Sequence, residues 1–185
     1  MKKIVDKSML GQAWVLPDSI GIDNSGDFVK NILHSRGIVT DADVAHFLNP
    51  SIKDSMPNPS VLRDMDNAVR VIADAIRDDQ KIAIYGDYDV DGITSTAICV
   101  RYLRSLGCDV VWHIPTRDGE GYGLNNSAID ELIDNGVKLI ITVDCGISCV
   151  NEVEHIKSRG CKIVITDHHL PEAVFPDADA VVNPK

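Results

Sequence analysis

Short apolar runs alternate with amphipathic helical segments from Lys81 to the end of the chain. The runs are rich in Val and Ile, and the segments between them carry apolar residues at helical spacing. The expected strands are residues 81–85, 108–115, 138–144, 161–166 and 178–184, and the expected helices are residues 94–107, 125–136 and 148–160. Strands alternating with helices of roughly 10 to 15 residues are typical of βαβ units. We therefore predict an α/β fold, a mostly parallel sheet flanked by helices in a Rossmann-like arrangement.

The first 60 residues have a different pattern. They show no regular alternation and are rich in Pro, Asn, Asp and Ser. Gly37 and Pro50 are expected to end two short helices, whose N-caps are Ser and Thr. The first helix is expected over residues 25–37 with Ser25 as its N-cap, and the second over residues 40–50 with Thr40 as its N-cap. We expect a small helical N-terminal segment at residues 1–60 and the α/β domain at residues 61–185.

A longer amphipathic helix is expected at the start of this domain, over residues 63–80. Its large apolar residues recur at helical spacing and predict a single buried face. The residues expected on that face are Met65, Val69, Ile72 and Ile76.

The composition is that of a soluble globular protein. Of the 185 residues, 44% are hydrophobic and 25% are charged. Asp6 and Lys7 interrupt the only candidate leader, and no run approaches the roughly 18 apolar residues that a membrane span needs. The five cysteines are an odd number without a Cys-x-x-Cys pair, which favours reduced thiols. We expect a cytoplasmic protein that binds no membrane.

Aspartates follow three of the expected strands directly. Asp87, Asp89 and Asp91 follow the first strand, Asp144 ends the third, and Asp167 follows the fourth. In an open α/β sheet, ligands bind outside the carboxyl ends of the strands. These three clusters can therefore converge on one crevice.

The first cluster, GDYDVDG at residues 86–92, is close to the loop of a calcium-binding EF-hand. Asp87, Asp89, Asp91 and Gly92 satisfy its first six positions. The twelfth position, which needs a bidentate Glu, holds Ile98, and an apolar strand precedes the loop where an EF-hand has a helix. These two departures argue against an EF-hand.

The strand-end residues are suited to divalent cations. Carboxylates combined with His168 and His169, which follow Asp167, favour Mn²⁺ or Mg²⁺. Two such ions about 4 Å apart can polarise a phosphoryl oxygen, activate water and stabilise the leaving oxygen. A bridging carboxylate is the usual means of holding the pair, and Asp144 is placed to be that bridge.

The net charge of −10 argues against a nucleic-acid partner, because such proteins usually have a basic face. Bound divalent cations would reverse the local field of an acidic cluster and weaken that objection.

Three motifs resemble the DHH phosphoesterase superfamily: GDYDVDG, VDCG at residues 143–146 and TDHH at residues 166–169. The set is most similar to the RecJ-like single-stranded-DNA-specific exonucleases. Branches with small substrates tend to carry a His four residues before the first aspartate of a two-aspartate motif, whereas this chain has Ala83 four residues before Asp87. The flanking stretches GITSTAI, PTRDGEGYGL and VVNP are also RecJ-like. The resemblance covers residues 60–185 strongly and the N-terminal part loosely.

The resemblance implies roles for individual residues. The implied metal ligands are Asp87, Asp89, Asp144 and His168, with Asp144 bridging two ions. His169 would be a ligand or a phosphate contact, and Arg117 would contact phosphate. Asp91, Asp167 and His169 would be the further catalytic residues, with Asp91 and Asp167 behind the ligands and Asp167 orienting an imidazole.

The resemblance also implies an activity, hydrolysis of single-stranded DNA from the 5′ end in recombination and repair. Single-strand-binding protein and a helicase would be partners. The family pattern continues with a fourth motif and a second domain, so we expect this chain to be an N-terminal fragment with weakened metal affinity and reduced or no activity. Two alternatives stay open at this point. One is a DHH phosphodiesterase for short oligoribonucleotides or cyclic dinucleotides, or a pyrophosphatase, and the other is a catalytically inactive DHH scaffold.

Overall fold

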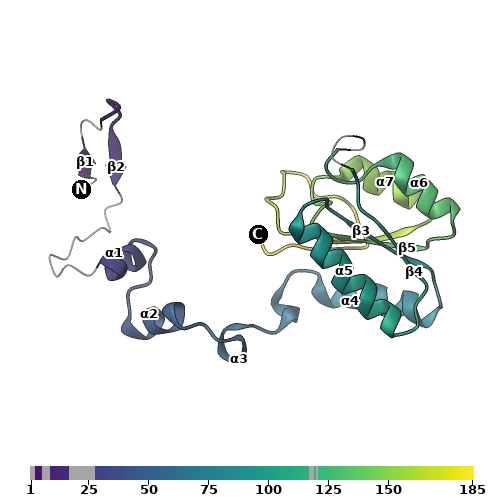
Figure 1. Cartoon of the computed structure of the whole chain (residues 1–185), viewed down its shortest axis with the longest axis horizontal. Coiled ribbons are helices and arrows are strands. Elements are labelled where there is room, and N and C mark those ends of the chain that lie inside the picture. The colour runs from purple at the N-terminus through teal and green to yellow at the C-terminus, as the bar shows by residue number, and fades with distance from the viewer. Residues whose placement is uncertain (1–2, 6–8, 17–27, 117–118, 120) are drawn as a thin grey trace. The chain divides into compact units, whose positions relative to one another are not determined.

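The computed structural model describes residues 3–5, 9–16, 28–116, 119 and 121–185, and the chain divides into two compact units (Figure 1). The N-terminal unit comprises residues 1–57. Its elements are the antiparallel pair β1 (Lys3–Val5) and β2 (Trp14–Leu16), and the helices α1 (Phe28–Ser35), α2 (Asp41–Leu48) and α3 (Ile52–Ser55). The Thr40 side chain caps α2 by accepting a hydrogen bond from the Asp43 backbone N–H at 3.1 Å. Ser25 lies outside the described residues, and the sequence pattern did not predict β1, β2 or α3.

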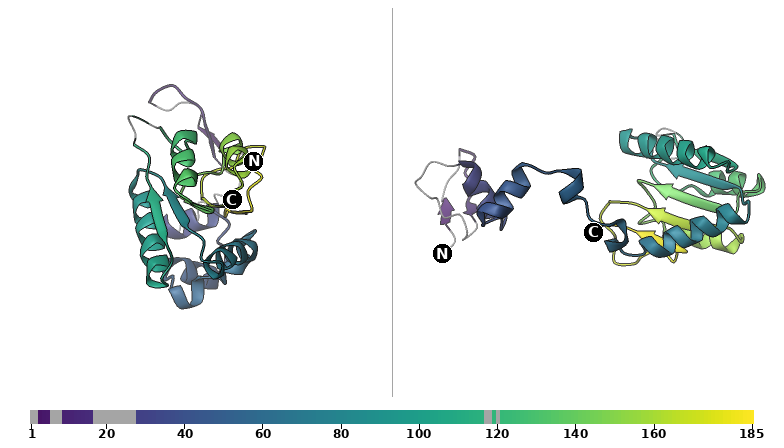
Figure 2. Two further views of the ribbon diagram at one scale, coloured as in Figure 1. Left: turned by 90° about the vertical axis from the view of Figure 1, so that its right-hand side faces the viewer. Right: turned by 90° about the horizontal axis from the view of Figure 1, so that it is seen from below.

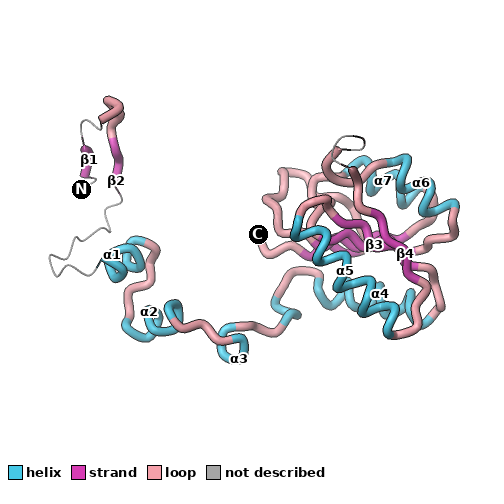
Figure 3. The backbone as a smooth tube through the Cα atoms, viewed as in Figure 1, coloured by secondary structure: helices cyan, strands magenta, loops and turns pink. Residues whose placement is uncertain are grey.

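The second unit, residues 58–185, is built on a five-stranded sheet. Its strands are β3 (Ile82–Gly86), β4 (Val110–His113), β5 (Leu139–Val143), β6 (Lys162–Thr166) and β7 (Ala180–Val182). They lie in the order β4-β3-β5-β6-β7, and every neighbouring pair is parallel. Figure 3 shows the strands in magenta and the helices around them in cyan. The predicted α/β fold with a parallel sheet is confirmed.

Helices cover both faces of this sheet (Figure 1). They are the α-helices α4 (Met65–Arg77), α5 (Val90–Ser105), α6 (Asn126–Asp134) and α7 (Val150–Ser158), and the 3-10 helix η1 (Pro59–Val61) precedes α4. Helices α4 and α5 pack on one face, as the right-hand view of Figure 2 shows, and α6 and α7 pack on the other. Both faces of the central strands β3 and β5 are therefore removed from water, as is usual for parallel sheets.

The side chains of the central strands alternate between two apolar cores. In β3, Ala83 and Tyr85 join the core under α6 and α7, whereas Ile82 and Ile84 join the core under α4 and α5. All four residues are fully buried. Burying a large aliphatic side chain contributes roughly 1.5 to 3 kcal/mol, so these two cores hold the carboxyl ends of the strands in place.

Two details of the predicted helices are wrong. Val69 was expected on the buried face of α4 but is 58% exposed, because Ala68, Val71 and Ala75 face the sheet instead. Small alanines allow α4 to lie close to the strands, and a pattern built on large residues misses them. Helix α5 begins at Val90, four residues earlier than expected, because Asp89 acts as its N-cap.

The five cysteines are free thiols, with Cys145 and Cys161 buried. None of the helices in the described part of the chain is long and apolar enough to cross a membrane.

Candidate metal centre

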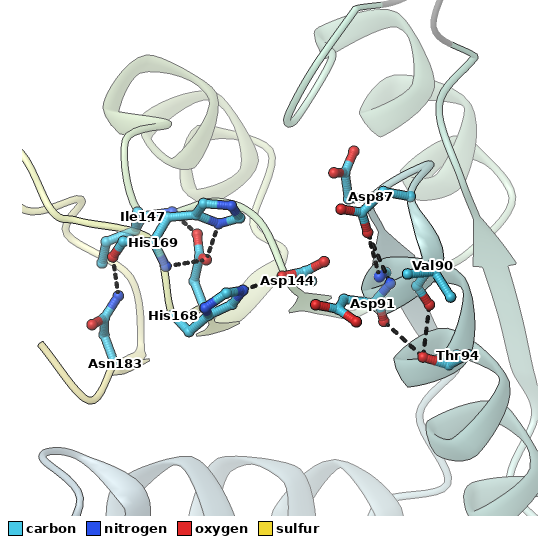
Figure 4. Close-up of polar contacts among 12 residues, drawn as sticks. Asp87, Val90, Asp91, Thr94, Asp144, Ile147, His168, His169 and Asn183 are labelled. Atoms are coloured by element: carbon cyan, nitrogen blue, oxygen red, sulfur yellow. Dashed lines mark hydrogen bonds and ion pairs between the residues drawn. The ribbon is translucent and has the colours of Figure 1, made fainter. Parts of the chain in front are cut away.

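Three aspartates meet at the carboxyl edge of the sheet. Strands β5 and β6 are neighbours, and β5 also pairs with β3, so Asp87, Asp144 and Asp167 follow three adjacent strands. The order of the strands reverses between β3 and β5, which is the switch point where ligands bind in open α/β sheets. In Figure 4, His168 and His169 lie on one side of Asp144, and Asp87 and Asp91 lie on the other.

The turn between β3 and α5 places the first motif. One oxygen of Asp89, Oδ1, accepts hydrogen bonds from the backbone N–H groups of Asp91 at 2.9 Å and Gly92 at 3.0 Å. The other oxygen of Asp89 is not used in this cap. Asp87 is buried, and its Oδ1 accepts a hydrogen bond from the Tyr88 backbone N–H at 2.7 Å. Each carboxylate is thus oriented by backbone donors and keeps an oxygen for another partner.

Glycines make this turn possible. A Cβ atom on Gly92 would lie 2.3 Å from the Asp87 carbonyl oxygen, and one on Gly86 would lie 2.1 Å from the Thr96 hydroxyl oxygen. Only glycine allows such a close approach of the first turn of α5 to the end of β3. Both glycines stand inside the GDYDVDG motif, but no local pattern in the sequence predicts their packing role.

Asp144 occupies the centre of the site in a strained backbone conformation. Its φ of 65° lies in the left-handed region, which Asp tolerates better than most residues. Its side chain is 5% exposed, and its oxygens accept no hydrogen bond among the described residues, although Nε2 of His168 lies 2.9 Å from Oδ1. Buried carboxylates are normally satisfied by donors or by a cation. Asp144 therefore fits a cation ligand.

The paired histidines differ in their surroundings. His169 is held by Asp167, whose Oδ1 lies 2.8 Å from Nδ1 of the ring and accepts the His169 backbone N–H at 3.0 Å. Oδ2 of Asp167 accepts the Ile147 backbone N–H at 3.0 Å, so both oxygens of this buried carboxylate are occupied. His168 is more exposed and points its Nε2 at Asp144.

Two groups of possible ligands share one residue. The first group is Asp87, Asp89 and Asp144, and the second is Asp144, His168 and His169. Within each group, the potential ligand atoms lie within 4.8 Å of one another. Carboxylate oxygens with imidazole nitrogens suit Mn²⁺ or Mg²⁺, and the shared Asp144 stands where a bridging ligand would stand. The residues therefore fit a pair of divalent cations.

The pKa values of the cluster reflect burial, hydrogen bonds and the repulsion between neighbouring carboxylates. Burial raises the pKa of Asp144, and the negative charge of Asp89 raises it further. The pKa of Asp89 is lowered, chiefly by the hydrogen bond from the Gly92 backbone. The hydrogen bond to Asp167 raises the pKa of His169. A divalent cation would relieve the repulsion between Asp89 and Asp144.

A cavity of about 480 Å³ opens beside these residues. Asp91 lies in the first turn of α5 and lines this cavity together with Asp144, Asp167 and His168. Asp91 belongs to neither ligand group among the described residues. Arg117, the expected phosphate contact, lies outside the described residues.

Tyr122 is a residue of the site that the sequence analysis missed. Its hydroxyl oxygen lies 3.1 Å from Nδ1 of His169, and its ring meets the imidazole edge-on with the centroids 5.7 Å apart. Burial raises the pKa of the Tyr122 hydroxyl, and the charge of Asp167 raises it further. The signal available in the sequence was an aromatic residue in the GEGYG stretch, but nothing local links it to His169.

The chain belongs to the DHH family. Residues 81–185, more than half of the chain, match the family model described as "DHH family, N-terminal domain". This match confirms the predicted membership of the superfamily.

Similar proteins with curated names include RecJ exonucleases of several bacteria, which confirms the predicted likeness. The protein named "Single-stranded-DNA-specific exonuclease RecJ" of Haemophilus influenzae is 45% identical over 131 residues, covering 70% of this chain and 23% of that protein. The protein of the same name from Salmonella typhimurium is 40% identical over 157 residues, covering 84% of this chain and 26% of that protein. The chain thus spans about a quarter of the length of these relatives.

Two solved structures resemble the chain. The "Crystal structure of exonuclease RecJ bound to manganese" superposes with a TM-score of 0.62 at 39% identity, covering 66% of this chain and 31% of that one. A RecJ from Thermus thermophilus in complex with Mn²⁺ gives a TM-score of 0.61 at 32% identity, covering 77% of this chain and 21% of that one.

Proposed function

We propose that this chain carries the metal-binding catalytic portion of an exonuclease that hydrolyses phosphodiester bonds of single-stranded DNA with two Mn²⁺ or Mg²⁺ ions. The observation that carries the proposal is the pair of ligand groups that share the buried Asp144. The names of the relatives supply the substrate, and manganese is bound in the two similar RecJ structures.

Each side chain has a role in this proposal. Asp87 and Asp89 would hold one ion, His168 would hold the other, and Asp144, which belongs to both ligand groups, would be shared by the two. His169 completes the second group or contacts the phosphate of the substrate. When bound, the ions would polarise the phosphoryl group, activate the attacking water and stabilise the leaving oxygen.

The neighbouring residues orient these ligands. Asp167 accepts hydrogen bonds from His169 and so holds the imidazole ring. Asp91 lines the cavity beside Asp144, where it would face a bound substrate or its water. Arg117 is retained as a phosphate contact on the resemblance alone.

The resemblance also supplies the 5′-to-3′ direction of digestion, the cytoplasmic location and the partners. Single-strand-binding protein and a helicase are proposed as partners on this basis only. The second candidate is a phosphodiesterase for short oligoribonucleotides or cyclic dinucleotides. It is less favoured because Asp91 directly precedes Gly92 and Ala83 replaces the His that such enzymes tend to carry.

The metal site is tested by titrating the chain with Mn²⁺ in a calorimeter. We expect binding to the unmodified chain and none to Asp144→Ala, because this change removes the ligand that both groups share. Asp109→Ala is the matched control. It removes an exposed aspartate just before β4, where the amino ends of the strands lie, whereas Asp144 lies at their carboxyl ends. Equal binding by the unmodified chain and Asp144→Ala would mean that the strand-end aspartates are only turn and cap residues.

The nuclease is tested in a protein of full length. Residues 61–185 replace the matching segment of the Haemophilus influenzae RecJ, and the chimera is given 5′-labelled single-stranded DNA, duplex DNA, a short oligoribonucleotide and a cyclic dinucleotide. Mononucleotides released from single-stranded DNA and abolished by Asp144→Ala support the exonuclease. Preferential cleavage of the oligoribonucleotide or cyclic dinucleotide would favour the second candidate.

A further inference from the structure

Tyr122 reaches the metal centre from a different part of the fold than any of the aspartates. It lies between β4 and α6, whereas His169 follows β6. Among the described residues, the hydroxyl of Tyr122 has one polar contact, the 3.1 Å approach to Nδ1 of His169. The edge-on packing of the two rings, with an interplanar angle of 79°, brings the hydroxyl to the ring nitrogen.

The backbone around Tyr122 fixes this position. The glycines on either side have left-handed backbones, with φ of 81° at Gly121 and 88° at Gly123. Leu124 is buried in the core, and Asn125 caps α6 by accepting the Ser127 backbone N–H at 2.9 Å. Tyr122 is therefore anchored within three residues of two fixed points, and its side chain is directed by the turn between the glycines.

The hydrogen bonds determine where the imidazole carries its proton. Nδ1 of His169 lies 2.8 Å from Oδ1 of Asp167, and an ionised carboxylate only accepts hydrogen bonds. Nδ1 must therefore be protonated, whether the ring is neutral or charged. With this proton on Nδ1, the oxygen of Tyr122 can only accept a share of the same N–H. Nε2 of the neutral ring is left with a lone pair, as a metal ligand requires.

We propose that Tyr122 is a positioning residue for His169: its hydroxyl oxygen shares the Nδ1–H hydrogen bond with Asp167, fixes the plane of the ring and keeps Nε2 free for a divalent cation. The proposal deepens the function proposed above and rests on it for the identity of the cation. Asp167 alone holds one edge of the imidazole, and a second acceptor restricts rotation about the Cβ–Cγ bond. The conformation of the β4–α6 connection thereby controls the orientation of a ligand that follows β6.

The first test needs no metal. The chain is labelled with ¹⁵N in its histidine rings, His169 is assigned by the signal lost in His169→Gln, and spectra are recorded at a pH where the ring is neutral. We expect a protonated Nδ1, an unprotonated Nε2 and a visible Nδ1–H proton in the unmodified chain. Tyr122→Phe keeps the aromatic ring but should broaden or remove that proton signal. Tyr102→Phe, which removes the hydroxyl of an exposed tyrosine on α5, should leave it unchanged.

The second test is a double-mutant cycle on Mn²⁺ affinity. Partners that orient a metal-binding His typically contribute about 10- to 100-fold to affinity, so Tyr122→Phe should weaken binding by about 10-fold. In the His169→Gln background the same change should have no further effect, because Tyr122 acts through His169.

The two tests separate the two proposals. If the unmodified chain binds no Mn²⁺, the proposed function fails, and the spectra still decide the role of Tyr122. The role is overturned if Nε2 carries the proton, if Tyr122→Phe leaves the His169 signals unchanged, or if it weakens Mn²⁺ binding equally in both backgrounds.

Discussion

Replacing Gly92 with alanine should damage both the fold and the metal centre. The added Cβ would lie 2.3 Å from the carbonyl oxygen, 2.5 Å from the nitrogen and 2.6 Å from the carbonyl carbon of Asp87. Ordinary van der Waals contact begins at 3.4 Å, so the shortest of these distances is too small by about 1 Å. Backbone atoms cannot rotate out of the way, and the first turn of α5 must therefore move away from β3.

The size of the effect follows from this displacement. Overpacking of this kind typically costs about 1 to 3 kcal/mol, and we expect the upper end because the clash is with backbone. For a unit of this size such a loss lowers the melting temperature by roughly 10 °C. The same movement separates Asp87 and Asp89 from Asp144, so Mn²⁺ affinity should fall by about 10- to 100-fold.

The assay is thermal unfolding and Mn²⁺ calorimetry on Gly92→Ala beside Gly107→Ala. Gly107 lies just beyond the other end of α5, has a φ of 85° and has no neighbour within 4 Å of an added Cβ. Its replacement costs only backbone strain, about 1 to 2 kcal/mol, and should not change Mn²⁺ affinity. The reasoning is refuted if Gly92→Ala melts no lower than Gly107→Ala and binds Mn²⁺ like the unmodified chain.

Three further predictions concern charge. Asp144→Asn should raise the melting temperature of the metal-free chain at neutral pH, because burial and the charge of Asp89 raise the pKa of Asp144 and disfavour its ionised form in the fold. Mn²⁺ should add no stability to this variant. A variant that melts at a lower temperature than the unmodified chain would contradict the prediction. Asp89→Ser should keep the melting temperature, because serine also caps α5, yet weaken Mn²⁺ binding, as calorimetry would show. Asp130→Asn should lower the melting temperature at neutral pH, because His155 and Arg159 lower the pKa of Asp130 below 3.8. This stabilisation exists above pH 3.8 and is lost as the pH falls through the lowered pKa, so the two melting curves should converge in acid.

Much of the fold was predictable because it depends on local pattern. Short apolar runs rich in β-branched residues, such as residues 139–143, are typical of strands buried on both faces, and the helices between them favour parallel pairing. The aspartates after β3, β5 and β6 then had to lie at one edge, because the carboxyl ends of parallel strands all point the same way. The sequence alone thus determined the class of fold and the edge that holds the candidate site.

Tertiary structure decided which of these side chains are neighbours. The order β4-β3-β5-β6-β7 places Asp144 between the other two strand ends, so that it alone belongs to both ligand groups found among the described residues. The contact of Tyr122 with His169 joins residues 47 positions apart, and the approach of Gly92 to Asp87 depends on how α5 packs on the sheet. Strand order, loop position and helix approach come from long-range packing of the two cores. A periodicity of two or 3.6 residues shows which side chains share a face of one strand or helix, but it does not predict how those elements pack together.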